Sequence, residues 1–377
     1  NGAAIFKNAA PIATISDISV EVLDIANGGS APETITSIKY NAPLDYASQG
    51  RCVTTEDYKV YAKKLYANAQ SVQVFGGENG SFDSSLGVVS AAEYGKVFIS
   101  VITTTGLSLT SSEKRQLVSD LSKYTVASIT PVIIDPDTTF IILNVQFKYD
   151  SSKTTSALSE VESEVVSAIT SYDTNNLGEF EKLFRHSQVT RLVDDANVSV
   201  LSNTTNVILG KFFTPTTTAS ASYYIYFNNA LYNPHSGHNS ADGGILSSTG
   251  FFISGDTTNE HFFDDNGEGI VRLYYLQSGA RVYVDTTAGT INYATGEVFI
   301  ESIFITTISD VDGATSTQVR LTVIPNSKDI VPVRNQILKL DLTNSTVTGQ
   351  VDTVAVGDGT SAATYTTSTS YSTPSGY

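Results

Sequence analysis

The stretch RCVTTEDYKVYAKKLYANAQSVQVFGG, from Arg51 to Gly77, changes its periodicity part-way along. Thr54 is a good helix N-cap, and Asp57, three residues later, can complete a capping box. A helical stripe of apolar and aromatic residues then ends near Asn68, and a period-two strand ends at two glycines. The sequence therefore predicts a short helix-to-strand unit; its stripe and strand residues are Tyr58, Val60, Tyr61, Leu65, Val72, Val74, Gly76 and Gly77.

Outside this unit, the first half of the chain alternates between the two kinds of apolar pattern. Capping signals and spacings of three and four predict helices, and short apolar runs predict strands. We expect helices at 111–124, 155–172 and 180–193, strands at 96–102 and 138–149, and a strand pair at 198–201 and 206–213.

Helical periodicity is lost after Phe213, where the segment TPTTTASAS begins. Aromatic strands then alternate with Gly- and Asp-rich turns, so the second half is expected to be all-β. The predicted fold class is α+β, with mixed α/β modules followed by an all-β C-terminal region. The predicted segments are a β segment at 1–30 (remnant of a larger N-terminal region), α+β modules at 31–130 and 131–213, a β-rich domain at 214–342 and an extended tail at 343–377.

Composition indicates a globular chain that does not bind polyanions. Of 377 residues, 41% are hydrophobic and 16% charged, and the net charge is −16, from 22 basic and 38 acidic residues. A phosphate-binding surface needs clustered Lys and Arg, so nucleic acid and an anionic membrane are not expected partners. The chain begins with Asn1 and contains no Met, which favours a longer polypeptide with a region before Asn1.

Residues suited to catalysis are scarce. Cys52, the only cysteine, follows Arg51, which can lower a thiol pKa, but a buried small residue is the simpler interpretation. The glycine pairs at 28–29 and 76–77 lack the Lys and helix cap of a phosphate-binding loop.

Two loops resemble metal sites in part. His235 and His238 could ligate a metal if Asp242 joined them, but solvated imidazoles are expected in so polar a loop. The sequence DDNGEG at 264–269 lacks the spaced ligands of a calcium loop and predicts a hairpin turn. We predict no catalytic, cofactor-binding or metal-binding residue and no cofactor.

The segment from Gly28 to Asn79 resembles the signature of baseplate J-like proteins from contractile phage tails. The pattern has a Gly-Gly turn, a Glu-Thr helix start, Ala-Pro, Gln and Arg, Val-Thr, Asp-Tyr, and a strand ending in Gly-Gly. Cys52 and Ala67 depart from it. The matching signature residues are Gly28, Gly29, Glu33, Pro43, Gln49, Arg51, Val53, Thr54, Asp57, Tyr58, Gly76 and Gly77.

The resemblance weakens towards Phe213, and the β-rich remainder is similar to wedge proteins of T-even-type myophages. It implies a structural, non-enzymatic subunit of a virion tail baseplate, assembled in the host cytoplasm. Such a subunit would form a homodimer within a wedge, contact its copies between wedges, and join other wedge proteins in a ring around the central hub.

Two other functions remain open. A β-rich glycan-binding tail or surface protein would account for the aromatic second half, and exposed Tyr along one groove would favour it. An enzyme, either a glycosidase or a hydrolase with a metal at His235 and His238, would be favoured by a tightly bound metal.

Overall fold

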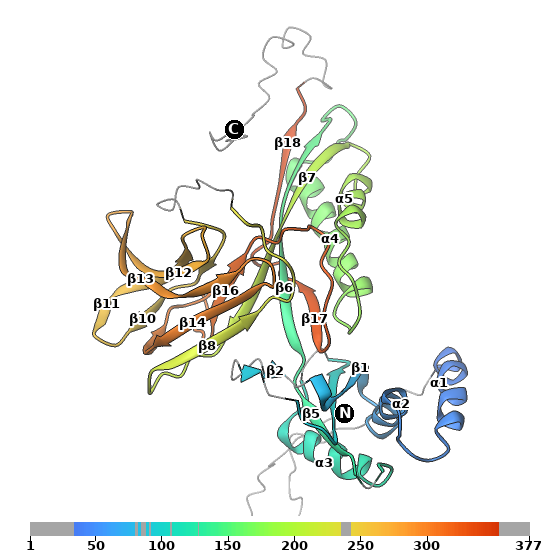
Figure 1. The fold of residues 1–377 in the computed structure, drawn as a ribbon. Helices are drawn as coiled ribbons and strands as arrows, with labels where there is room; N and C mark the ends of the chain where they lie inside the picture. The colour runs from blue at the N-terminus through green and yellow to red at the C-terminus, as the bar shows by residue number, and fades with distance from the viewer. Residues whose placement is uncertain are drawn as a thin grey trace, which may run out of the picture. The chain divides into compact units, whose positions relative to one another are not determined.

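The computed structural model describes residues 34–79, 82–83, 88–89, 92–105, 108–126, 128–234 and 243–353 (Figure 1). The chain divides into two compact units. Unit 1 comprises Asn1–Gly80 and Ala92–Asp135, and unit 2 comprises Ser81–Ala91 and Pro136–Tyr377.

Unit 1 is built on a three-stranded sheet in the order β1-β4-β5. Strand β1 is antiparallel to β4, whereas β4 and β5 are parallel. Parallel strands need a long crossover, and helix α3 supplies it between β4 and β5. The elements are α1 (Ile35–Ser48), α2 (Thr55–Leu65), β1 (Ala69–Gly76), the 3₁₀ turn η1 (Gly77–Asn79), β4 (Lys96–Thr103), α3 (Ser111–Leu121) and β5 (Thr130–Ile134).

The core of unit 1 lies between helices α2 and α3 and the sheet. The inward stripe predicted for α3, Leu117 and Leu121, is buried as expected. Strand β4 is buried from its second residue to its last, which confirms the buried strand predicted at 96–102. The buried core residues include Cys52, Tyr58, Tyr61, Ala62, Val72, Ile99, Val101, Leu117 and Leu121.

Unit 2 is organised around strand β6, which is paired along both edges. Strand β7 runs antiparallel along one edge. Strands β17 and β18 run parallel to β6 along the other edge, one after the other. Helices α4 and α5 lie together beside β6 and β7 (Figure 1). The elements are β6 (Asp137–Tyr149), α4 (Leu158–Asn176), α5 (His186–Asp195), β7 (Val200–Phe213), β17 (Gln336–Leu340) and β18 (Thr346–Val351).

Helix α4 buries three of the four residues of its predicted stripe, Val161, Val165 and Ile169, whereas Leu158 remains 36% exposed. Leu158 instead approaches β18 at Gly349. A Cβ on Gly349 would lie 2.5 Å from Leu158 Cδ1 and 2.6 Å from Phe147 Cζ, so only glycine allows this approach. The backbone N–H of Gly349 donates to the carboxylate of Glu162 at 2.9 Å.

The sheet continues from β7 through β16, β9, β11, β12, β13 and β14 to β8. Part of it closes on itself, because β15 continues the line of β14 and both β15 and β11 pair with β10. A closed ring of strands results. The remaining elements are β2 (Phe82–Asp83), β3 (Val88–Val89), β8 (Ala221–Tyr226), β9 (Ser247–Ser248), β10 (Phe251–Ile253), β11 (Asp256–Asp265), β12 (Ile270–Gln277), β13 (Ala280–Asn292), β14 (Glu297–Ile303), β15 (Ile305–Ile308) and β16 (Val319–Val323).

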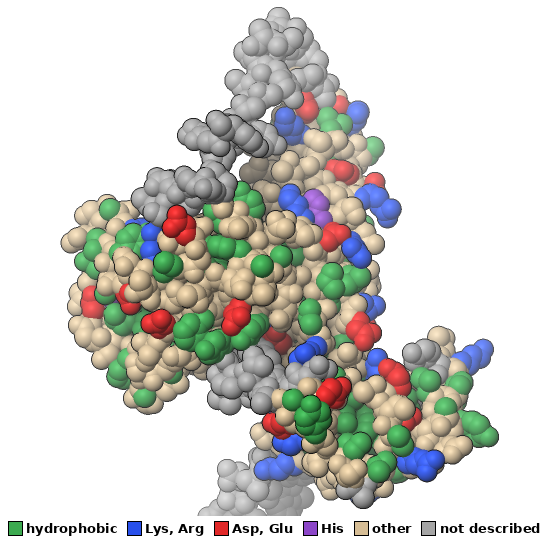
Figure 2. Space-filling view, viewed as in Figure 1, with side chains coloured by type: hydrophobic (Ala, Val, Ile, Leu, Met, Phe, Trp, Pro, Cys, Tyr) green, Lys and Arg blue, Asp and Glu red, His purple; other side chains and the backbone are tan. Residues whose placement is uncertain are grey.

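The interior of the ring is apolar and aromatic. Phe251 and Phe263 face each other with ring centroids 4.8 Å apart. Both side chains are fully buried. Aromatic pairs at this separation add to the stabilisation from burial alone. On the face shown in Figure 2, charged side chains are scattered over a largely uncharged surface, in line with the dispersed acidity of the sequence.

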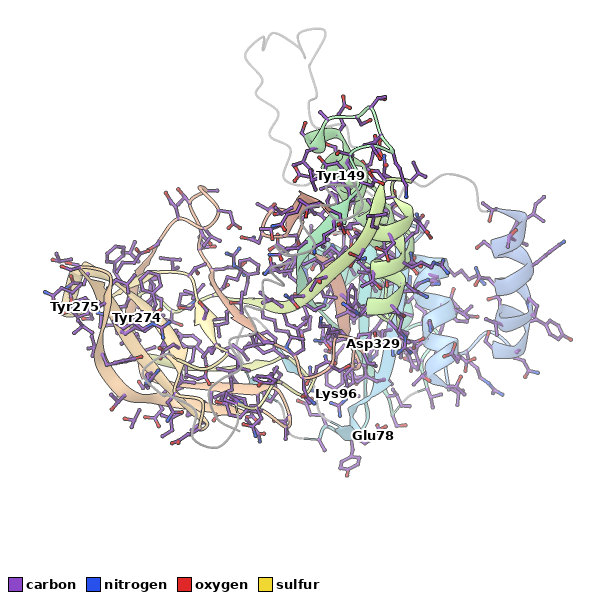
Figure 3. All side chains as sticks on the ribbon, turned by 90° about the horizontal axis from the view of Figure 1, so that it is seen from above. Glu78, Lys96, Tyr149, Tyr274, Tyr275 and Asp329 are labelled. Carbon is purple, nitrogen blue, oxygen red and sulfur yellow. The ribbon has the colours of Figure 1, made fainter. Side chains whose placement is uncertain are left out.

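Helix α5 begins six residues later than predicted. Phe180 and Phe184 are buried, and the Phe184 backbone pairs with Ile330, which holds 180–185 out of the helix. The cap then comes from a distant residue: Asp329 accepts from the His186 backbone N–H at 2.9 Å and from Arg185 Nη1 at 3.0 Å (Figure 3). The bond from His186, followed by that from Arg185, lowers the pKa of Asp329.

The α+β fold class is confirmed. In the described residues after Phe213 there are strands and no helix. The strand pair predicted at 198–201 and 206–213 was wrong, because β7 is one unbroken strand that pairs with β6 over most of its length. The predicted tail from 343 starts with β18, and its residues from 354 onward lie outside the described part, as do residues 1–30. The predicted module boundaries stay a prediction.

His261, on β11, is fully buried among the strands of the ring. Neither ring nitrogen has a hydrogen-bond partner in the described structure. Nε2 lies 3.7 Å from Asp256 Oδ2, and the ring meets Tyr275 (labelled in Figure 3) edge-on at 5.8 Å. Burial lowers the pKa of His261, and Asp256 and the Asn259 backbone offset this only in part.

We therefore expect the stability of unit 2 to fall as the pH drops below about 6.5. The unfolded chain binds a proton at His261 before the folded chain does, so acid favours unfolding. Chemical unfolding between pH 8 and pH 5.5 measures this, and His261→Phe should flatten the dependence over that window. An unchanged pH slope in His261→Phe would contradict the assignment.

Candidate functional site

The signature residues Thr54 and Asp57 form the predicted capping box at the start of α2. Thr54 Oγ1 accepts from the Asp57 backbone N–H at 3.2 Å. Asp57 Oδ2 accepts from the backbone N–H groups of Thr54 at 2.8 Å and Val53 at 3.1 Å. Partial burial acts to raise the pKa of Asp57, but these hydrogen bonds outweigh it and lower the pKa. The arrangement fixes the residue at which α2 begins.

Tyr58 and Cys52 lie beneath this cap, and both are fully buried. Burial and, to a lesser extent, the nearby Asp57 raise the pKa of the Cys52 thiol to about 12, so the thiol stays protonated. The buried small residue expected at Cys52 is therefore confirmed. Burial likewise raises the pKa of Tyr58 to about 12. The Tyr58 hydroxyl has no hydrogen-bond partner in the described residues, so its ring contributes by packing.

The residues between α1 and α2 form a tight turn. Gln49 caps the end of α1 in the left-handed region, with φ of 50°, and Gly50 follows with φ of 79°. Arg51 and Val53 are exposed in the turn. Pro43 lies inside α1, and the helix continues through it.

Gly76 and Gly77 end strand β1, as predicted. At Gly77 the requirement for glycine is steric, because a Cβ would lie 2.1 Å from the carbonyl oxygen of Glu93. The Gly77 carbonyl accepts from the Glu93 backbone N–H at 2.7 Å. The glycine therefore lets the chain leaving β1 pass against the segment that enters β4.

Glu113 connects the ends of the two core helices of unit 1, a contact that sequence reasoning missed. Its carboxylate accepts from the Thr110 backbone N–H at 2.7 Å, which completes a second capping box at the start of α3. The other oxygen accepts from the Tyr66 hydroxyl at 2.7 Å, at the end of α2. Burial and this bond raise the pKa of Tyr66 to about 12. The motif Thr110–Glu113 is visible in the sequence; its Tyr66 partner is not.

Asp264 is the buried centre of a charge cluster in unit 2. Its Oδ1 accepts from Arg272 Nε at 2.9 Å, and its Oδ2 accepts from Arg281 Nη1 at 2.7 Å and the Tyr283 hydroxyl at 2.9 Å. The Arg272 guanidinium also lies over the Tyr283 ring, 4.2 Å from its centroid. These residues come from three adjacent strands, β11, β12 and β13.

Asp265, the next residue, fastens the loop before β9 to the ring. Its carboxylate is fully buried and accepts from the backbone N–H groups of Ile245 at 2.6 Å and Leu246 at 2.7 Å. The Tyr293 hydroxyl donates to its other oxygen at 2.5 Å. The hairpin turn predicted at 264–269 joins β11 to β12, but the sequence did not reveal that both aspartates are buried and hydrogen-bonded within the fold.

Several predicted positions lie outside the described residues: Gly28, Gly29 and Glu33 of the signature, and the loop residues His235, His238 and Asp242. Within the described residues, no group of three or more His, Cys, Asp or Glu could hold a metal ion. No helix there is long and apolar enough to cross a membrane. The signature residues in the described part of the chain fix helix starts, turns and core packing. Such roles suit a protein that holds its surfaces in fixed positions.

The first prediction from this geometry concerns Thr54→Ala. Losing an N-cap side chain costs about 1 kcal/mol, so unit 1 should unfold at lower denaturant. Urea unfolding followed by circular dichroism measures the change. Thr55→Ala, at the next and exposed position, is the matched control and should have little effect. An equal loss in both variants would show that the cap is not the cause.

The second concerns Asp264→Asn. Removing one charge of a buried, hydrogen-bonded pair costs about 3–5 kcal/mol, because the buried Arg272 would then face a neutral amide in place of the Asp264 carboxylate. Thermal unfolding should show a large destabilisation of unit 2. Asp285→Asn, an exposed position on β13, provides the control. A loss below about 1 kcal/mol in Asp264→Asn would contradict the account.

Two family models match the chain in succession. Residues 54–134 match the C-terminal domain I of the baseplate structural protein gp6, and residues 137–211 match its C-terminal domain III. The first match ends at β5 of unit 1, and the second runs from β6 through α4 and α5 into β7.

Among curated proteins, the chain is 28% identical over 183 residues to "Baseplate wedge protein gp6" of Enterobacteria phage T4. The alignment spans 48% of this chain and 26% of that protein, so the chain matches about a quarter of the relative's length. Among solved structures, the baseplate of the anti-feeding prophage shares 17% identity over 53% of this chain and 42% of that chain. Its TM-score of 0.31 is too low to carry an argument. The sequence matches place the protein in the tail baseplate of a virion, as a structural component.

Proposed function

We propose that the protein is a structural subunit of a baseplate wedge, which associates with its own copies and with other wedge proteins to form the ring around the central hub. The observation that carries the proposal is the succession of the two domain matches, which together run from residue 54 to residue 211. The name of the T4 relative supports membership of a wedge. The J-like signature from Gly28 to Asn79 belongs to the same proposal.

The proposed role is non-enzymatic. The single thiol is buried with a raised pKa, which removes the activated nucleophile that cysteine chemistry needs. The charged groups of the Asp264 cluster are engaged with one another across strands β11, β12 and β13. Signature residues such as Thr54 and Asp57 determine where helices begin. Fixed helix starts of this kind keep the surface of the protein in a defined shape.

Apolar side chains on the surface of unit 1 support a role in assembly. Helix α1 carries Ile35, Ile38 and Tyr46 with 73%, 46% and 86% of their surfaces exposed. Permanent interfaces bury roughly 2,000 Å² or more and are richer in apolar and aromatic residues than free surface. We propose that such surfaces become covered in the homodimer and in the ring.

Analytical ultracentrifugation tests the self-association. The full chain should sediment as a discrete multimer at micromolar concentration. Deletion of 354–377, which removes the Ser/Thr/Gly-rich end but leaves β18 intact, should weaken association about tenfold, or 1.4 kcal/mol. Co-expression with the other tail proteins of the same virus tests the heterotypic contacts. A chain that stays monomeric and also fails to join them would overturn the proposal.

A further inference from the structure

Among the described residues, strand β8 is the last strand of the main sheet and pairs only with β14. The Phe227 N–H donates to the Gly296 oxygen, and this bond shows which residues of β8 turn their backbone groups towards β14. From Tyr223 to Phe227, every second residue therefore bonds to β14, and the N–H and C=O groups of Tyr224 point away from it. An edge of this kind is a template for another strand.

The outer face beside this edge is aromatic. The Tyr224 ring lies 4.5 Å from the Phe299 ring on β14 and 6.4 Å from the Tyr226 ring, measured between centroids. Tyr224 remains 38% exposed. Phe299 pairs in register with Thr290 on β13, and Thr290 pairs with Ile270 on β12, which is 36% exposed. A partly exposed row thus crosses four strands.

Carboxylates flank the aromatic rings. Glu297 and Glu301 lie on β14 on either side of Phe299, and the Tyr226 hydroxyl donates to Glu297 at 3.2 Å. A hollow of about 580 Å³ adjoins Glu297 and also contains Glu268. Its lining has no Lys or Arg; the lining residues are Asn233, Glu268, Gly269, Thr290, Ile291, Asn292, Tyr293, Ala294 and Glu297. Figure 2 shows acidic and hydrophobic side chains side by side in the region where Figure 1 places β8 and β14.

We infer that this face, formed by Tyr224, Tyr226, Glu297, Phe299, Glu301 and the hollow at Glu268, binds an extended basic segment of another baseplate protein. The segment adds as a strand to the free edge of β8, and its Lys or Arg side chains meet the carboxylates and the aromatic rings. The inference rests on the proposed function for the source of the partner.

The charge of this face distinguishes between two possible occupants of the β8 edge, a different protein and a second copy of this chain. If β8 paired with β8 of another copy, both β14 strands would add acidic side chains to the joined face and neither copy would supply a cation there. Each copy also carries a net charge of −16, and such self-repulsion disfavours this pairing. A cationic segment instead brings charges that complement Glu297 and Glu301. The occupant is therefore a different, basic partner.

A labelled extended peptide of alternating Val and Lys is the probe, and fluorescence anisotropy against the full chain at low salt is the measurement. The wild type should bind it, and a Val–Glu peptide should bind at least tenfold more weakly. Glu301→Lys should weaken binding about tenfold. Asp310→Lys makes the same change of charge at an exposed position after β15 and should have little effect.

Ser222→Pro tests the strand edge separately. Ser222 lies where the pairing of β8 with β14 shifts register, between Ile300 and Ile303, and edge strands tolerate proline at such irregular positions. Binding of the Val–Lys peptide should fall while the unfolding midpoint stays within about 0.5 kcal/mol of wild type. No binding by the wild type, equal binding of both peptides, or equal losses in Glu301→Lys and Asp310→Lys would overturn the inference.

Amide hydrogen exchange gives a measurement that needs no variant. In the assembly with co-expressed tail proteins, the peptide spanning 221–227 should exchange at least tenfold more slowly than in the isolated chain. The β12–β13 turn at Ser278 and Gly279 serves as an internal reference. A chain that joins the assembly with unprotected 221–227 amides refutes strand addition and leaves the proposed function standing. A chain that does not join refutes both.

Discussion

Strand β6 has no free edge along most of its length, and unit 2 depends on this. Its antiparallel neighbour β7 is the next strand in the chain, after helices α4 and α5, but β17 and β18 come from near the described end. The side chains of Gln336 and Thr139, 197 positions apart, hydrogen-bond across this junction. Helices α4 and α5 then cover the sheet, and the strands that form the ring extend it beyond β7. Strand β6 is therefore complete only when β7, β17 and β18 are all in place beside it.

Buried charge occurs at two places where strands of this sheet pair with each other. Lys211 on β7 bonds to Asp137 at the start of β6, and both side chains are about 5% exposed or less. Burial lowers the pKa of Lys211, and Asp137 opposes this shift. The Asp264 cluster performs the same role in the ring. A buried pair adds little net stability, but a slipped register would leave each charge without its partner, which is far more costly.

Local features were predictable from the sequence and long-range ones were not. The capping box at Thr54 and Asp57, the stripe of α3 and the end of β1 at Gly77 all depend on residues within a few positions. The start of α5 depends on Asp329, 143 positions away, so no local pattern could reveal it. The same applies to the Asp264 cluster: the pair of aspartates reads as a turn until Arg272 and Arg281 are known to lie on adjacent strands. Ring closure through β10 and β15 is equally invisible, because alternation predicts strands but not their neighbours.

The parallel pairing of β17 and β18 with β6 also has a consequence during synthesis. Unit 1 takes its described elements from residues 35–134 and can fold while the chain is still being translated. Unit 2 must wait until the ribosome has released residues beyond Val351, because until then one edge of β6 lacks a neighbour. A prematurely terminated chain therefore exposes an unpaired, apolar strand, the kind of surface that chaperones and proteases recognise. A product that includes β18 has this edge of β6 covered and does not expose it.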